Sequence, residues 1–321
     1  MIRVLRANRR SIYQPRLRFR HDGASVNVAQ LKADNAKELL LIPEVIQRES
    51  FKKELQSGIA SGAAKQSAAG ASASMTDSDL KLCLDATFLT FHCHVESRIA
   101  SRLGYGYYTI GPCGEELMSA VALSLRPTDA SALHYRHVGT SIARQLLAQE
   151  SVDTVALNRA RATTCSIHDP VTAGKHCAIG GSPYDFYVTS TLASQTPPAV
   201  GRALGFSIAH MNKVDSIFPK DSVSFVSVGD GSTHNAHFLA ATNLAELAIS
   251  QGFRCPVVFC VSNNELCISF KNKGWAGENG SLLARMGATM ETFTANGNPN
   301  PNPNPNPNPN PNPHHDPKPN H

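Results

Sequence analysis

The stretch "VSFVSVGDGSTHNAHFLAATNLAELAISQGFRCPVVFCVSNN", from Val223 to Asn264, is the most informative part of this sequence for the architecture. It begins with the apolar run VSFVSVG and closes with the run PVVFCVS, each typical of a strand that is buried on both faces. A helical segment from about Asn235 to Ser250 lies between them. Strand, helix and strand of these lengths predict a βαβ unit with parallel strands. We therefore expect an α/β fold with a parallel sheet flanked by helices.

Polar residues follow both apolar runs. Gly229-Asp230-Gly231 ends the first run, and Asn263-Asn264 ends the second. Because the carboxyl ends of parallel strands share one edge of a sheet, where ligands bind, we expect these residues to lie together. Glycine lets the backbone approach a ligand closely, and the N-terminus of the next helix favours a phosphate. The Asp230 carboxylate, the Asn264 amide oxygen and the Leu266 carbonyl would suit a Mg²⁺ ion that holds a diphosphate.

Other phosphate-binding motifs fit this stretch less well. A dinucleotide fingerprint requires glycine or alanine at the position of His234, and the chain contains no GxxxxGK loop. The plainer alternative is a turn rich in glycine and asparagine between ordinary sheet elements. GDG at the end of one strand together with NN at the end of the next is more specific than either motif alone, which favours a binding site.

Helical patterns precede this unit. "TDSDLKLCLDATFLTFHCHVESRIASRLG" has Thr76 and Asp79 at capping-box spacing, apolar residues on one face, and Gly104 as a stop. It predicts an amphipathic helix. "GEELMSAVALSLRP", residues 114–127, and "HVGTSIARQLLAQ", residues 137–149, predict two further helices.

The two ends of the chain have unusual compositions. Residues 1–30 contain arginines among apolar residues and no acid before Asp22, which predicts a mitochondrial transit peptide and a location in the mitochondrial matrix. A solvated basic tail, for example an arm that binds nucleic acid, is the alternative. Residues 31–76 form an extension with an Ala/Ser/Gly linker from Ser57 to Thr76. Residues 298–321, with their Asn-Pro repeat, predict a disordered tail.

Composition limits the partners. The net charge of +5 is concentrated in the N-terminal block, so we expect no nucleic-acid partner. No apolar run has the length needed to cross a bilayer, so we expect no membrane partner either. The eight cysteines are scattered and form no CxxC pair, which predicts reduced thiols rather than a disulfide framework or a zinc ribbon.

The sequence resembles a known family. GDG followed by about thirty residues and NN is similar to the signature of thiamine-diphosphate enzymes. The surrounding sequence is most like the alpha subunit of the decarboxylating component of 2-oxoacid dehydrogenases, above all the branched-chain, 2-oxoisovalerate, members. Three more stretches carry the likeness: "YTIGPCGEELMSAVALSLRPTD", "HYRHVG" and "VTSTLASQTPPAVG". The resemblance implies that residues 77–297 are a thiamine-diphosphate-binding domain that is incomplete at its C-terminal end.

The resemblance implies roles for individual residues. Tyr135 and Arg136 match the pair at the diphosphate, where a guanidinium can bind phosphate oxygens. Ser190 and Leu192 match positions that contact the aminopyrimidine ring. The GDG motif and the residue after it, Gly229, Asp230, Gly231 and Ser232, would hold the diphosphate, with Asn264 and Leu266 completing the Mg²⁺ site.

Two further assignments follow from the same likeness. The branched-chain members hold a K⁺ ion in the loop that matches "VTSTLASQ", so its oxygen-bearing residues are candidate ligands: Thr189, Thr191, Ser194 and Gln195. An ordinary polar loop is the alternative. His176 falls near an active-site loop and is the candidate catalytic residue, although a lone histidine is more often structural. Ser262 and His134 depart from the family, which has arginine and glutamine at these positions.

The implied function is oxidative decarboxylation of a 2-oxo acid, with transfer of the acyl group to a lipoyl-bearing acyltransferase. A beta subunit would supply the glutamate that activates the pyrimidine. Alone, the chain is expected to show no decarboxylation. The alternative is a non-catalytic remnant that binds cofactor or partner without turnover, which the abrupt start of the repeat at Asn298 favours. Branched-chain and other 2-oxo acids both remain open as substrates.

Overall fold

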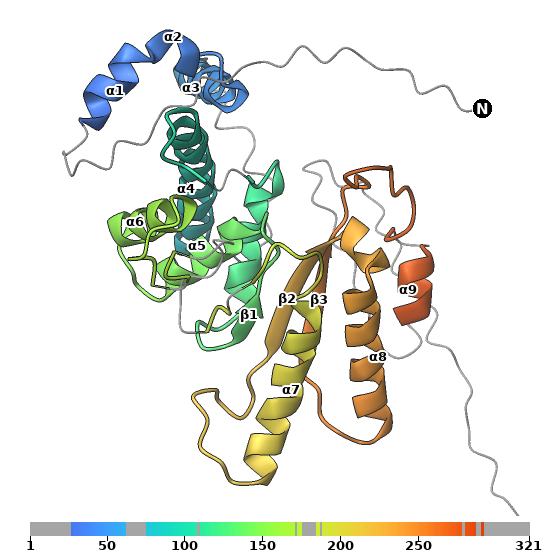
Figure 1. Ribbon diagram of the computed structural model, residues 1–321. Helices are drawn as coiled ribbons and strands as arrows, with labels where there is room; N and C mark the ends of the chain where they lie inside the picture. Colours follow the sequence, from blue (N-terminus) through green and yellow to red (C-terminus); the bar gives the residue numbers. More distant parts are fainter. Residues whose placement is uncertain are drawn as a thin grey trace, which may run out of the picture.

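The computed structural model describes residues 27–61, 75–107, 110–170, 172–174, 184–186, 188–277, 280–286 and 290–291. Within these residues the chain forms a three-stranded parallel sheet in the order β1-β2-β3 (Figure 1). The strands are β1 (Ala130–Ala132), β2 (Ser224–Gly229) and β3 (Val257–Ser262), and helix α8 (Ala236–Ser250) connects the last two. The predicted βαβ unit is therefore confirmed. Asn235 caps α8, and its side chain accepts a hydrogen bond from the His237 N–H.

Helices cover both faces of the sheet. Helix α7 (Thr196–Met211) and α8 lie on the face of β2 that carries Val226 and Val228 (Figure 1). On the opposite face, Phe225 packs with residues of the loop after β1, of the 3₁₀ helix η3 (Glu115–Ser124) and of α6 (Val152–Thr163). Alternate residues of β2 thus enter two different cores, as the continuous apolar run predicts.

Strand β3 differs from its prediction. We expected it to be buried on both faces, but none of its residues is fully buried, and Val258 is 46% exposed. Val258 pairs in register with Phe225 and therefore points to the same face of the sheet. The layer that buries Phe225 reaches Cys260 of β3 but leaves Val258 exposed, and β3 is an edge strand of the described sheet. An apolar run in the sequence shows that the side chains of a strand are hydrophobic, but it does not show which of them are covered by other parts of the chain.

The predicted helices before the sheet are present. Helix α4 (Asp77–Arg102) begins with a capping box between Thr76 and Asp79, and Gly104 just after it has a φ of 85°. Helix α5 (Val138–Leu147) matches the third predicted helix. The second forms a 3₁₀ helix, η3, instead of an α-helix. None of the described helices has the length and hydrophobicity that a membrane span requires.

Three helices precede α4: α1 (Val28–Asp34), α2 (Ala36–Leu39) and α3 (Pro43–Ser61). Leu39, Ile42 and Val45 pack against the side of α4 that carries Val95 and Ile99. Helix α3 extends through residues 57–61, the beginning of the predicted linker. Residues 1–26, most of the predicted transit peptide, residues 62–74 of the linker, and the Asn-Pro repeat lie outside the described residues.

Candidate functional site

The carboxyl ends of β1 and β2 lie close to each other through His134. This residue follows β1, and its backbone N–H donates to the Oγ of Ser227 in β2 at 2.9 Å. Its ring lies beside Gly229, because a side-chain Cβ built on Gly229 would be 3.9 Å from the imidazole. The HYRH segment and the GDG segment therefore share one edge of the sheet, which agrees with the roles that the family resemblance implies for them.

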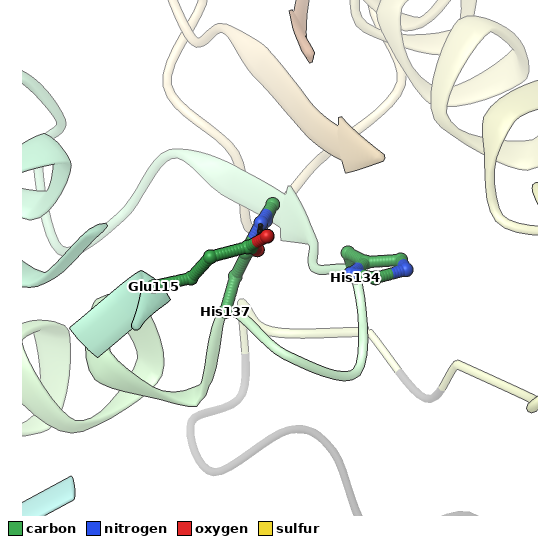
Figure 2. A group of neighbouring side chains, drawn as sticks. All are labelled: Glu115, His134 and His137. Carbon is green, nitrogen blue, oxygen red and sulfur yellow. Dashed lines mark hydrogen bonds and ion pairs between the residues drawn. The ribbon is translucent and has the colours of Figure 1, made fainter. Parts of the chain in front are cut away.

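Glu115 connects this edge to the end of β3. It is the first residue of η3, and its Oε2 lies 2.6 Å from Nε2 of His137 (Figure 2). Its Oε1 accepts a hydrogen bond from the side-chain amide of Asn264 at 3.2 Å. Burial alone would raise the pKa of Glu115, but the hydrogen bond from His137 and the positive potential of that residue lower it overall. Glu115 therefore remains a carboxylate at neutral pH.

His134 is neutral, whereas Glu115 is charged. Burial and the neighbouring charges of His137 and Arg136 lower its pKa to about 3, against the partial effect of Glu115. Its imidazole is therefore neutral at physiological pH and keeps a lone pair on one ring nitrogen.

Asp230 lies at the start of the 3₁₀ helix η4 (Asp230–His234) and is 1% exposed. Its Oδ2 accepts a hydrogen bond from the Asn272 side chain at 2.9 Å, and Asn272 Oδ1 lies 2.8 Å from Nε2 of His234. A hydrogen bond from a neutral amide offsets only part of the cost of burying a carboxylate. This residue is therefore suited to bind a cation. Asn272 was not among the predicted site residues.

Asn264 and Leu266 form a tight turn after β3. Oδ1 of Asn264 accepts the Leu266 N–H at 2.9 Å, while Glu265 between them has a φ of 56°. An amide oxygen has two lone pairs, so this oxygen can still bind a metal. Gly229 in β2 pairs with Ser262 in β3. The residues that come next in the chain, Asp230 and Asn263, therefore start from adjacent positions. The donors present at these strand ends thus fit the predicted Mg²⁺ set.

Arg136 is held near this edge by the loop before η3. Its Nη1 donates to the carbonyl of Gly111 at 2.8 Å and to Sγ of Cys113 at 3.2 Å. Its guanidinium also lies 5.4 Å from the ring centre of Tyr135. These contacts fix the orientation of a cation that the sequence assigns to the diphosphate. The Gly111 interaction brings "IGPCG" and "HYR" together although they lie apart in the sequence.

The loop with the candidate pyrimidine and K⁺ residues packs against β2. Gln195 donates from Nε2 to the carbonyl of Ser227 at 2.9 Å. Ser190 is exposed and Leu192 is half-buried. The hydroxyls of Thr189 and Ser194 lie 2.9 Å apart, and Thr189 Oγ1 also accepts the N–H of Thr191 at 3.3 Å. Two of the four candidate K⁺ ligands therefore converge.

The GDG turn is closely packed from both sides. Thr233 donates to the Asp230 carbonyl at 2.6 Å and accepts from the Trp275 indole at 2.7 Å. Ser232 is buried, and a Cβ on Gly231 would lie 2.6 Å from Sγ of Cys267. His176, the candidate catalytic residue, lies outside the described residues.

The sequence missed Glu115, His137 and Asn272 as site residues. Glu115 was noted only as a charge at a helix start, and His137 only as part of HYRHVG. A contact such as that between Glu115 and Asn264 joins residues 149 positions apart, so no local pattern predicts it.

A known family matches the part of the chain that contains this edge. Residues 92–298 match the family model described as "Dehydrogenase E1 component". The match spans more than half of the 321-residue chain and includes the whole edge from Glu115 to Leu266. No curated protein matches the chain.

Proposed function

The chain belongs to the dehydrogenase E1 component family, and from this premise we propose that it is the alpha subunit of a mitochondrial branched-chain 2-oxoacid dehydrogenase. The family consists of thiamine-diphosphate-dependent 2-oxoacid dehydrogenases that bind the cofactor with a metal ion. Alpha-type members normally act with a beta subunit and a lipoyl acyltransferase, and we extend both partners to this chain.

One observation carries the proposal. Asp230, a buried carboxylate, follows β2, and Asn264 follows the paired strand β3 at the same edge of the sheet. Mg²⁺ prefers oxygen ligands of these kinds and keeps places for diphosphate oxygens. Arg136 stands at the loop after β1 and adds a cation for the phosphates.

When bound, thiamine diphosphate supplies the carbanion chemistry that releases carbon dioxide from a 2-oxo acid. The residues of this chain would hold and orient it: Asp230, Asn264 and the Leu266 carbonyl through Mg²⁺, Arg136 at the diphosphate, and Leu192 at the pyrimidine ring. Gln195 would support the last contact, because it ties the 188–195 loop to β2. K⁺ would bind between the hydroxyls of Thr189 and Ser194.

The finer parts of the proposal have separate support. The likeness of "HYRHVG" and "VTSTLASQ" to the branched-chain members favours 3-methyl-2-oxobutanoate and its homologues as substrates. The arginine-rich N-terminal block favours import into the mitochondrial matrix.

Calorimetry of the purified chain with thiamine diphosphate and Mg²⁺ tests the site. We expect Asp230→Asn and Asn264→Ala to abolish Mg²⁺-dependent binding, because the first removes the negative charge of a metal ligand, the second removes a ligand, and neither removes an apolar core residue. Asp215→Asn is the matched control, since Asp215 is exposed and lies in the loop between α7 and β2. Unchanged affinity in both site variants would refute the assignment.

A second assay addresses the substrate. After mixing with a beta subunit, the chain should decarboxylate 3-methyl-2-oxobutanoate faster than pyruvate. The family match stops at residue 298, where the Asn-Pro repeat begins, and this favours the non-catalytic remnant as the second candidate. Cofactor binding without turnover in the mixed system would support the remnant.

A further inference from the structure

Three metal-ligating side chains meet beside the site just described. The ligand atoms of Glu115, His134 and His137 all lie within 4.8 Å of one another, and no other such group of three occurs in the described part of the chain. Figure 2 shows Glu115 reaching from η3 to the ring of His137, while His134 stands earlier on the same loop after β1. The two imidazole centres are 5.0 Å apart.

The cluster is buried and its hydrogen bonds are incomplete. His137 is fully buried and His134 is 5% exposed. Nε2 of His137 contacts Glu115, but its Nδ1 has no hydrogen-bond partner among the described residues. One imidazole can offer only one of its nitrogens to a given ion, and Nε2 of His137, which already faces Glu115, is the nitrogen that can share an ion with that carboxylate.

We propose that Glu115, His134 and His137 form a binding site for a divalent transition-metal ion such as Zn²⁺. Imidazole nitrogens suit Zn²⁺, Cu²⁺, Fe²⁺ and Ni²⁺, and a carboxylate oxygen completes a common three-residue set. Mg²⁺ prefers oxygen ligands only, so the site differs in chemistry from that of Asp230 and Asn264. Three protein ligands leave a fourth position for water or another oxygen donor.

The geometry needs only a small adjustment. Ligands of a tetrahedral ion with bonds near 2.0 Å lie about 3.3 Å apart. The Glu115 and His137 atoms are now 2.6 Å apart, and the most separated ligand atoms are within 4.8 Å. To bring the ligand atoms to this separation, the side chains must move by about an ångström, which small changes of their rotamers allow.

The supporting contacts hold these ligands in place. Asn264 donates to Oε1 of Glu115, which leaves Oε2 toward the imidazoles. The backbone of His134 is fixed by its bond to Ser227, and its Nδ1 accepts the Arg136 N–H at 3.4 Å, so Nε2 is the nitrogen left for a metal. Partners of this kind orient metal ligands in known sites.

The test uses the full chain with His314, His315 and His321 replaced by alanine, so that the C-terminal histidines cannot bind the metal. After treatment with chelator, the chain is titrated with Co²⁺ in the presence of excess Mg²⁺. Co²⁺ replaces Zn²⁺ and has visible absorption bands that report four-coordinate geometry. We expect one equivalent to bind with these bands, and Zn²⁺ to displace it.

Single substitutions define the ligands. Glu115→Gln, His134→Gln and His137→Gln should each weaken Co²⁺ binding by more than about 100-fold, because loss of a direct ligand exceeds the usual effect of loss of a supporting residue. Asp230→Asn should leave Co²⁺ binding unchanged while it removes Mg²⁺-dependent cofactor binding. Circular dichroism confirms that each variant is folded.

Two results would overturn the proposal. One is the absence of stoichiometric Co²⁺ binding in the parent chain, which would mean that Glu115 and His137 form only a hydrogen-bonded pair. The other is binding that persists in the Glu115→Gln variant, which nearly preserves side-chain shape, and in the His134→Gln variant. Failure of thiamine diphosphate binding would affect only the proposed function, since Co²⁺ binding is measured without cofactor.

Discussion

Replacing Gly231 with alanine should destabilise the chain by steric overlap alone. The added Cβ would lie 2.6 Å from Sγ of Cys267 and 3.3 Å from its Cβ, whereas such atoms normally approach to about 3.5–4.0 Å. Relief of the overlap requires Sγ or the GDG turn to move by about 1 Å. The turn is held by Thr233 and Trp275, so it cannot move freely. We expect a loss of about 2 kcal/mol, within the range for overpacked sites.

Thermal unfolding followed by circular dichroism measures this loss. About 2 kcal/mol lowers Tm by roughly 4–8 °C for a domain of this size. Gly201→Ala is the matched control: Gly201 is in α7 with nothing within 4 Å of the new Cβ, so stability should stay the same or rise. Cys267→Ala should restore most of the stability of Gly231→Ala. Our steric reasoning is wrong if the Gly231 variant melts with the wild type, or if the Cys267 change does not rescue it.

Further predictions concern the residues around this turn. Asn272→Ala should cost about 1–3 kcal/mol in urea unfolding, because Asp230 loses a buried donor; a cost equal to that of an exposed Asn212→Ala control would contradict this. The low pKa of His134 means that the unfolded chain binds a proton below pH 6.5 that the folded chain takes up only near pH 3. Stability should therefore fall by up to about 1.4 kcal/mol per pH unit on acidification through this window, and His134→Gln should remove this part of the slope in chelator-treated protein. Arg136→Lys should weaken thiamine diphosphate binding about tenfold in calorimetry, because lysine cannot bind two phosphate oxygens side by side; equal affinity would place the phosphates elsewhere.

The sequence predicts the central architecture well because its signals are local. Two apolar runs around one helix determine a parallel βαβ unit, and the chain order then places Asp230 and Asn264 at one edge. The capping box at Thr76 and the stop at Gly104 likewise depend on neighbouring residues only.

The remaining features depend on contacts between distant segments. Val258 is exposed because the layer that covers Phe225 reaches Cys260 of β3 but not Val258, and the sequence of β3 carries no sign of this. Asn272 reaches Asp230 from 42 positions away, within a stretch that has no regular periodicity. The choice between an α-helix and a 3₁₀ helix over residues 115–124 also escapes the apolar pattern, which both helix types satisfy.

The hydrogen bond between Glu115 and Asn264 has a consequence for the order of folding. Its partners are 149 residues apart, so the loop that it closes includes α5, α6, α7, β1 and β2. Contacts between residues so far apart in the sequence cost more chain entropy to close, so they form late and slow folding. The individual helices, and the connection from β2 to β3 through α8, depend on contacts between residues that are closer in the sequence. A partly folded intermediate can therefore have nearly native helix content while it still lacks the ligand-binding edge, and the affinity for ligands should appear only in the slowest refolding phase.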